Sequence, residues 1–372
     1  MVSKIHPGDQ MSSRQRLLAA YRGEAVDRLP YWAKVCNPTW RTTQPARVRA
    51  WSDRQLLDYI LADGIFGVGN ALRIRRPRVE EDSSTADGVR TTVTRTPDGD
   101  LREQWRMDPA TRSWHPVEFP VKTIDDLKRF GWVYEDVSVE IDQEALAKAA
   151  AVCEQIGERG ITKTSWGTSP LMHLVEHVIG PVNTHLMLAD VPEEMDELIE
   201  RMHAVCLAAA REVAHSTPAD LVCSVENTST TLISPAQFDR YCYGHLCDYG
   251  RAVEEERKMH ELHMCGLLGA LLERIDTIPA ASIEAFSSPT LADTRLADGR
   301  TRAPSKTLVG GTNCCVWLWP AERIEGYIAA ELAACPDNRR TVLTTAGVAP
   351  PACSAETFRR IGEWIPRAAI KM

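Results

Sequence analysis

The sequence of 372 residues lacks several features that would place it in other classes of protein. It has no run of 18 apolar residues that could cross a membrane as a helix. Its first segment, MVSKIHPGDQMSSRQR, has no apolar stretch of the kind found in secretory signals. We therefore expect a cytoplasmic protein with no membrane partner.

An excess of positive charge is also missing. The chain has 43 Lys and Arg residues against 51 Asp and Glu, which gives a formal net charge of -8. Its one dense basic stretch, RIRRPR at residues 73–78, is short and is followed by acidic residues. These features argue against nucleic-acid binding and favour a small molecule as the substrate.

Segments of biased composition, internal repeats and long linkers are absent as well. A hydrophobic content of 44% is enough for a large core. We expect a single domain over residues 1–372, with a polar tail at residues 1–11. The 11 cysteines are an odd number at irregular spacings, which indicates reduced thiols rather than a disulfide framework.

Eight short β-rich segments punctuate the chain, and helical patterns lie between most of them. A serine followed by apolar positions predicts a first helix over residues 12–24. The clearest later helix covers residues 191–215. The β-rich segments are residues 28–35, 64–69, 161–167, 221–228, 258–265, 282–287, 306–313 and 340–347. This alternation predicts an α/β fold, a (β/α)8 TIM barrel with an N-terminal helix.

One region interrupts the alternation. The segment GVRTTVTRTPDGDLREQWRM contains two polar β-rich runs around the turn signal Pro97-Asp98-Gly99. We interpret it as a β-hairpin inserted after the second strand, within residues 83–120 or so. Such an insertion could cover the mouth of the barrel.

Two His-x-Cys pairs raise the question of a metal site. His245 and Cys247 lie within a long helical pattern, where residues two apart do not share a face. His263 and Cys265 lie in a segment with strand character, where residues two apart point to the same side. Only the second pair could bind one ion, and the alternative is that its side chains are packing residues.

Several segments together resemble the uroporphyrinogen decarboxylase superfamily. They are SSRQRLLAAYRGEAVDRLPYW, VENTSTTLISPAQFDRY, HELHMCG, TLVGGTN and TTAGVAPPACSAETFRRIGEWI, and the likeness spans about Ser12 to Pro366. This superfamily has the barrel fold and contains porphyrinogen decarboxylases and zinc-dependent methyltransferases that work with corrinoids. The Arg-Gln-Ala-Gly-Arg-Tyr signature of the decarboxylases is absent, because the corresponding place contains AKVCNPTWRTTQP.

The resemblance to the methyltransferases implies a zinc site. Their His-x-Cys element matches His263 and Cys265, and imidazole and thiolate are ligands that zinc prefers. Their further cysteine follows a glycine at the end of the last strand, where this chain has Ala346-Gly347. We expect Cys353, a few residues on, as the third ligand, with Cys314 as the alternative.

Other candidate site residues lie at the ends of the predicted strands. Glu226 and Asn227 are the candidate catalytic residues: the Glu226 carboxylate could bind zinc, donate a proton or bind a cationic substrate, or it could cap a helix or be a polar loop residue. Glu284 could line the mouth or point to the helix layer. Candidate substrate-binding residues are Trp32, Lys34, Asn37, Trp166, Glu284 and Asn313, with core packing as the alternative for the tryptophans. His173 and His177 share a helix face and are expected to be packing or surface residues.

The sequence lacks the common signatures of cofactor-binding domains. There is no Gly-x-Gly-x-x-Gly, no P-loop and no Asp-x-His-x-x-Gly of a corrinoid domain, so cobalamin would arrive on a partner protein or bind transiently. The resemblance predicts transfer of a methyl group from an O-, N- or S-methyl compound to a corrinoid or thiol acceptor. Alternatives are a metal-free decarboxylase or lyase and a non-catalytic ligand-binding barrel. The sequence is also compatible with a homodimer.

Overall fold

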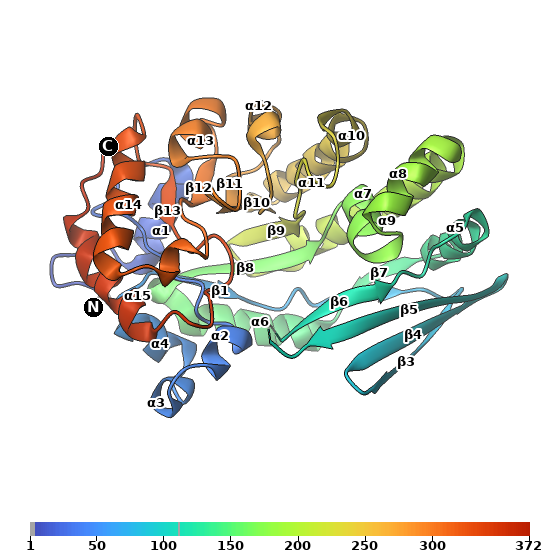
Figure 1. Cartoon of the computed structure of the whole chain (residues 1–372), viewed down its shortest axis with the longest axis horizontal. Helices are drawn as coiled ribbons and strands as arrows, with labels where there is room; N and C mark the ends of the chain where they lie inside the picture. Colours follow the sequence, from blue (N-terminus) through green and yellow to red (C-terminus); the bar gives the residue numbers. More distant parts are fainter. Residues whose placement is uncertain (1–3, 111) are drawn as a thin grey trace.

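The computed structural model describes residues 4–110 and 112–372, so residues 1–3 of the predicted tail lie outside the described part (Figure 1). Its central element is a curled parallel sheet of seven strands in sequential order. The strands are β1 (Gly64–Gly67), β8 (Gly160–Gly167), β9 (Leu221–Val225), β10 (Met259–His263), β11 (Ser282–Phe286), β12 (Thr307–Gly310) and β13 (Thr341–Leu343).

The segment around Tyr31 links the two edges of this sheet. Tyr31 forms a parallel bridge to Leu343 in β13, and its carbonyl accepts a hydrogen bond from the backbone N–H of Asp63, just before β1. This segment is one of the eight that the sequence predicts as strands. The arrangement is therefore an α/β fold that is compatible with a (β/α)8 barrel.

Helices surround the curled sheet. Helix α1 (Ser13–Arg22) begins with a capping box of Ser12 and Gln15 and ends at Gly23, which has a φ of 74°. The other helices are α2 (Pro38–Thr42), α3 (Ala46–Arg49), α4 (Asp53–Tyr59), α5 (Ile124–Gly131), α6 (Gln143–Ile156), α7 (Pro170–His173), α8 (Pro181–Asp190), α9 (Pro192–Ser216), α10 (Pro235–Phe238), α11 (Gly244–Glu255), α12 (Leu272–Asp276), α13 (Leu296–Arg302), α14 (Ala321–Ala334) and α15 (Ala355–Trp364). A π-helical turn, Leu174–Val178, continues α7.

The insertion after β1 is larger than the predicted hairpin. The hairpin strands β4 (Val89–Thr96) and β5 (Gly99–Asp108) form the centre of a four-stranded antiparallel sheet with β3 (Glu80–Ala86) and β6 (Ser113–Glu118). All seven residues of β3 are exposed, so no apolar alternation marked it as a strand. Strands β2 (Leu72–Arg75) and β7 (Ser138–Ile141) pair separately and connect the insertion to the barrel.

The inside of the curled sheet is filled by side chains from several strands. Helix α1 contributes Leu17, Ala20 and Tyr21 to this cluster. The remaining buried members are Trp32, Ile65, Ile161, Leu221, Val309 and Val342. Because this layer is packed with side chains, a small-molecule ligand has room to bind only beyond the carboxyl ends of the strands.

In the described part of the chain, no helix is both long enough and apolar enough to span a membrane.

Candidate active site at the mouth of the curled sheet

A buried carboxylate organises the carboxyl ends of the strands. Glu284 of β11 is 1% exposed and lies beside His263 of β10 in the parallel register. Its Oε1 accepts a hydrogen bond from Lys34 Nζ at 2.6 Å, and its Oε2 accepts one from Nδ1 of His263. Lys163 Nζ lies 3.7 Å from Oε2. One carboxylate thus contacts three nitrogen-bearing side chains from three strand segments.

The charges determine the protonation states of this cluster. Burial alone would raise the pKa of Glu284, but the ammonium groups of Lys163 and Lys34 outweigh it and hold that pKa well below its usual range. Burial opposes the charge on His263, yet hydrogen bonds to Cys265 and Glu284 raise its pKa to about 9. Glu284 is therefore an ionised acceptor that orients the imidazole of His263.

A second carboxylate lies deeper and supports the first. Glu261 of β10 is fully buried, and its Oε1 accepts a hydrogen bond from Lys163 Nζ at 2.8 Å. Its Oε2 accepts from the Tyr21 hydroxyl at 2.6 Å and from Ser282 at 3.1 Å. Lys163 is thus shared between two acidic side chains, and the attraction of both raises its pKa above the usual value although burial opposes this.

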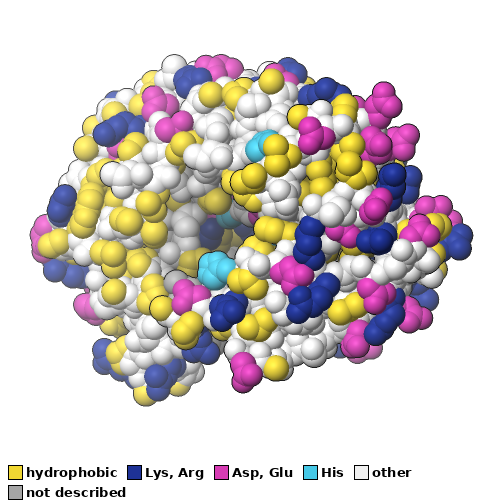
Figure 2. All heavy atoms as spheres, turned by 45° about the vertical axis from the view of Figure 1, so that its right-hand side comes forward, with side chains coloured by type: hydrophobic (Ala, Val, Ile, Leu, Met, Phe, Trp, Pro, Cys, Tyr) yellow, Lys and Arg dark blue, Asp and Glu magenta, His cyan; other side chains and the backbone are white. Residues whose placement is uncertain are grey.

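Cys265 follows β10 and lies next to His263 at the surface of the mouth. Its thiol is exposed and donates a weak hydrogen bond to Oδ1 of Asn227 at 3.6 Å. The amide group of Asn227 in turn donates to Oε2 of Glu176 at 2.9 Å. Figure 2 shows that this molecule is hollowed on one face, with histidine and basic side chains visible inside the hollow.

The donor chemistry of this pair fits zinc in two respects. Imidazole and thiol are the ligand types that zinc prefers, and a zinc-binding histidine usually donates its other ring N–H to a carboxylate, as His263 does to Glu284. The third donor is not in place: within residues 4–110 and 112–372, no group of three His, Cys, Asp or Glu side chains is arranged to hold a metal ion.

Most of the chain matches a known protein family. The model of the uroporphyrinogen decarboxylase (URO-D) family matches residues 120–361, which is more than half of the chain. The chain belongs to the URO-D family. This confirms the relationship that the sequence motifs indicate.

Solved structures give a second comparison for this URO-D family member. A methyltransferase from Methanosarcina mazei is similar, with a TM-score of 0.60 and 14% identity over 95% of this chain and 97% of that chain. At this identity the likeness shows a shared fold. A protein from Listeria monocytogenes described as a vitamin-B12 independent methionine synthase covers 60% of this chain and 68% of that chain, at 13% identity and a TM-score of 0.38, which is too low to support an inference. No curated protein matches the sequence at a significant level.

Some predicted residues of the URO-D site meet at the mouth. Lys34, Glu284, His263, Cys265 and Asn227 are connected there by the contacts described above. Trp32 lies below them, 9% exposed, with the ammonium groups of Lys34 and Lys163 at 5.6 and 5.3 Å from its ring centre. Trp32 therefore supports the two lysines through cation–π attraction.

Glu226 is turned away from the mouth. Its carboxylate is fully buried and accepts hydrogen bonds from the backbone N–H of Ser169 at 2.6 Å and from the Ser169 hydroxyl at 2.7 Å. Burial raises the pKa of Glu226 to about 7. In this position it fixes the loop that leads into α7, and its predicted role in proton transfer stays a prediction.

Three other predicted residues have structural partners. Asn37 caps α2 by accepting from the N–H of Trp40, and its amide donates to the carbonyl of Lys34. Asn313, in the loop after β12, is buried, and its amide donates to the carbonyls of Ser288 and Pro289 in the loop after β11. Trp166 donates to Ser224 on the helix-facing side of the sheet and packs edge-on against Tyr249.

Cys353, the predicted third zinc ligand, lies apart from His263 and Cys265. It is 3% exposed, and burial raises the pKa of its thiol to about 12. Its carbonyl accepts hydrogen bonds from Trp40 at 2.8 Å and Gln44 at 3.2 Å, so the loop that carries it is fixed. The alternative, Cys314, is half-buried next to Cys315.

Lys163, Glu261 and Tyr21 belong to this site but were not among the residues predicted from the sequence. A signal was present for Glu261, because it precedes His263 by two residues and must share its face of the strand. Lys163 stands in the middle of a mostly buried strand, where a lysine requires an acidic partner. Nothing in the sequence marks Tyr21 as a site residue, since the periodicity of the first helix alone explains an apolar side chain at this position.

Proposed function

We propose that this URO-D family member is a zinc-dependent methyltransferase that moves a methyl group from a small O-, N- or S-methyl compound to a corrinoid or thiol acceptor. One observation carries the proposal: His263 and Cys265 lie together at the end of β10, and a buried carboxylate orients the imidazole. The M. mazei methyltransferase supports it only by sharing the fold.

His263 and Cys265 would hold the zinc ion. Because Nδ1 of His263 donates to Glu284, Nε2 is the nitrogen left for the metal. Cys353 stays the proposed third ligand, and its loop would have to leave Trp40 and Gln44 in order to reach the pair. Cys314 is the alternative.

A bound zinc ion would polarise the heteroatom that carries the methyl group, or would hold an acceptor thiol as its thiolate. The chain's own contribution is to keep this centre rigid. Lys34 and Lys163 hold Glu284 in its ionised form, and Glu284 fixes the ring of His263. Oδ1 of Asn227 accepts a hydrogen bond from the Cys265 thiol and so helps to position the sulfur.

Metal analysis tests this proposal. The protein purified without chelator and supplied with zinc should contain one zinc per chain, and Cys265→Ala should contain none. Cys315→Ala is the control, because it removes another exposed thiol that follows β12 and not β10. A wild-type protein without zinc would contradict the proposal. Full zinc occupancy in Cys353→Ala would exclude Cys353 as a ligand and leave the rest of the proposal unchanged.

A further inference from the structure

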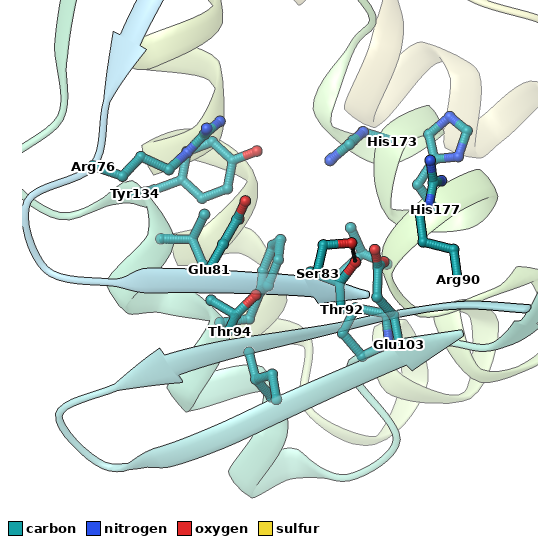
Figure 3. Close-up of a pocket in the computed structure, with 15 residues that line it drawn as sticks. Arg76, Glu81, Ser83, Arg90, Thr92, Thr94, Glu103, Tyr134, His173 and His177 are labelled. Carbon is teal, nitrogen blue, oxygen red and sulfur yellow. Dashed lines mark hydrogen bonds between the residues drawn. The ribbon is translucent and has the colours of Figure 1, made fainter. Parts of the chain in front are cut away.

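A cavity of about 370 Å³ lies between the inserted sheet and the helices next to the mouth (Figure 3). Arg76 and Tyr134 lie together at one end, and His173 and His177 point into it from α7 and the π-helical turn. Strands β3 and β4 form its floor with the hydroxyls of Ser83 and Thr92. Its volume is in the range of small-molecule sites.

Arg76 differs from its basic neighbours in having no acidic partner. The other arginines of the RIRRPR run form ion pairs: Arg73 with Asp142, Arg75 with Glu140 and Arg78 with Asp136. Arg76 forms no ion pair with any residue that the structure describes, and its Nε is buried without a hydrogen-bond partner. A guanidinium group that lacks a counter-ion favours a carboxylate or another anion beside it.

The surroundings of Arg76 suit an acid with an apolar body. The guanidinium lies 5.9 Å from the centre of the Tyr134 ring, which also lines the cavity. Burial lowers the pKa of His173 to about 4, so this histidine is a neutral hydrogen-bonding group. Phe130, Val133 and Leu101 supply apolar wall, while Glu81 and Glu103 lie on the sheet side, where Glu81 is exposed.

The cavity is connected to the mouth by short contacts. His177 lines it, and Nε2 of His177 lies 3.7 Å from Oε2 of Glu176. The same oxygen accepts from Asn227, which accepts from the thiol of Cys265. These contacts link the His177 wall of the cavity to Cys265 through Glu176 and Asn227.

We infer that the cavity binds a small organic carboxylate through Arg76, and that the substrate of the proposed methyl transfer is a methylated carboxylic acid. The second half of this inference rests on the proposed function. The first half does not, because binding at Arg76 requires neither zinc nor turnover.

Calorimetric titration with 4-methoxybenzoate and its neutral analogue 4-methoxybenzamide tests the inference. Wild type should bind the acid at least about 10-fold more tightly than the amide, since charged hydrogen bonds have that effect. Arg76→Gln should lose this preference, and Arg76→Lys should keep part of it. Arg75→Gln, which removes the exposed arginine that ends β2 directly before Arg76, should behave as wild type. Thermal melting would verify that each variant is folded.

Each outcome separates the two proposals. Equal binding of acid and amide, no binding of either, or an unchanged preference in folded Arg76→Gln would overturn the inference. If acids bind through Arg76 but no donor is demethylated, the site stands and the proposed function fails. If methyl transfer proceeds from neutral donors and is unaffected by Arg76→Gln, the function stands and the inference about its substrate fails.

Discussion

Glu284 is the side chain on which the candidate site depends most. It is buried, it contacts Lys34 and His263 directly, and it shares Lys163 with Glu261. Burying a carboxylate is unfavourable unless cations and hydrogen-bond donors surround it. These conditions are met here, so the arrangement is stable only as a whole, and removal of one charge leaves others without a partner.

We expect Glu284→Gln to lower the free energy of unfolding by about 3 kcal/mol, because Lys34 and Lys163 lose a counter-charge. We also expect it to weaken zinc binding about 10- to 100-fold, because His263 loses the carboxylate that orients it. Urea unfolding and competition with a chelating dye measure the two effects.

Glu261→Gln is the matched control for this substitution. Glu261 is an equally buried carboxylate bound to Lys163 and Tyr21, but it makes no hydrogen bond to His263. It should lower stability while leaving the affinity for zinc nearly unchanged. Equal losses of zinc affinity in both variants would mean that Glu284 acts through general electrostatics and not by orienting His263.

At the scale of the element, strand β10 carries polar side chains on both faces. Glu261 and His263 face the inside, and His260 faces the helix layer, where Ser224 lies 2.8 Å from its Nε2 and the Pro279 carbonyl 3.1 Å from its Nδ1. Burial lowers the pKa of His260 to about 4. The folded strand therefore holds this imidazole in its neutral form.

This produces a predictable loss of stability in acid. Between pH 6.5 and 4 the unfolded chain binds a proton at His260 that the folded chain does not, so the free energy of unfolding falls as the pH falls through this window. The contribution is up to about 3 kcal/mol. His260→Asn should show a shallower decline than wild type in urea unfolding between pH 7 and 4. If wild type and His260→Asn lost stability in parallel as the pH falls, His260 would have the same pKa in the folded and unfolded chains.

The sequence predicts the barrel strands better than the insertion. Each strand of the parallel sheet falls within or next to a predicted β-rich segment, because buried strands consist of apolar and β-branched residues. Strands β3 and β6 escaped prediction because β3 is polar and exposed along its whole length, and β6 is short, with Trp114 and Val117 as its large apolar residues. Hydrogen bonding to β4 and β5, not burial, defines them.

The site was predictable where its residues are close in sequence. His263 and Cys265 share a strand face by spacing alone, and the register to β11 then brings Glu284 beside His263. The contact between Glu284 and Lys34 joins residues 250 positions apart, so it depends on how the sheet curls. Likewise, nothing in the local sequence could show that Glu226 turns to Ser169 or that Cys353 is held by Trp40.

At the scale of the whole molecule, the inserted sheet extends away from both termini and lies beside the mouth of the curled sheet (Figure 1). Its strands supply part of the cavity at Arg76, while the barrel supplies His263 and Cys265. In our proposals the barrel therefore carries the zinc ligands, and the insertion carries part of the carboxylate site. A family of common fold can vary its substrates in this way.

Methyl transfer itself is the most direct test of the account. With reduced cob(I)alamin as acceptor and a set of methoxylated aromatic acids, methylamines and methyl thioethers as donors, the zinc-loaded wild type should convert the corrinoid to methylcobalamin, followed by its spectrum. Folded Cys265→Ala should lose this activity by at least about 100-fold, as expected when the centre that activates the substrate is removed. Equal activity in both proteins, or release of carbon dioxide without methyl transfer, would contradict the account.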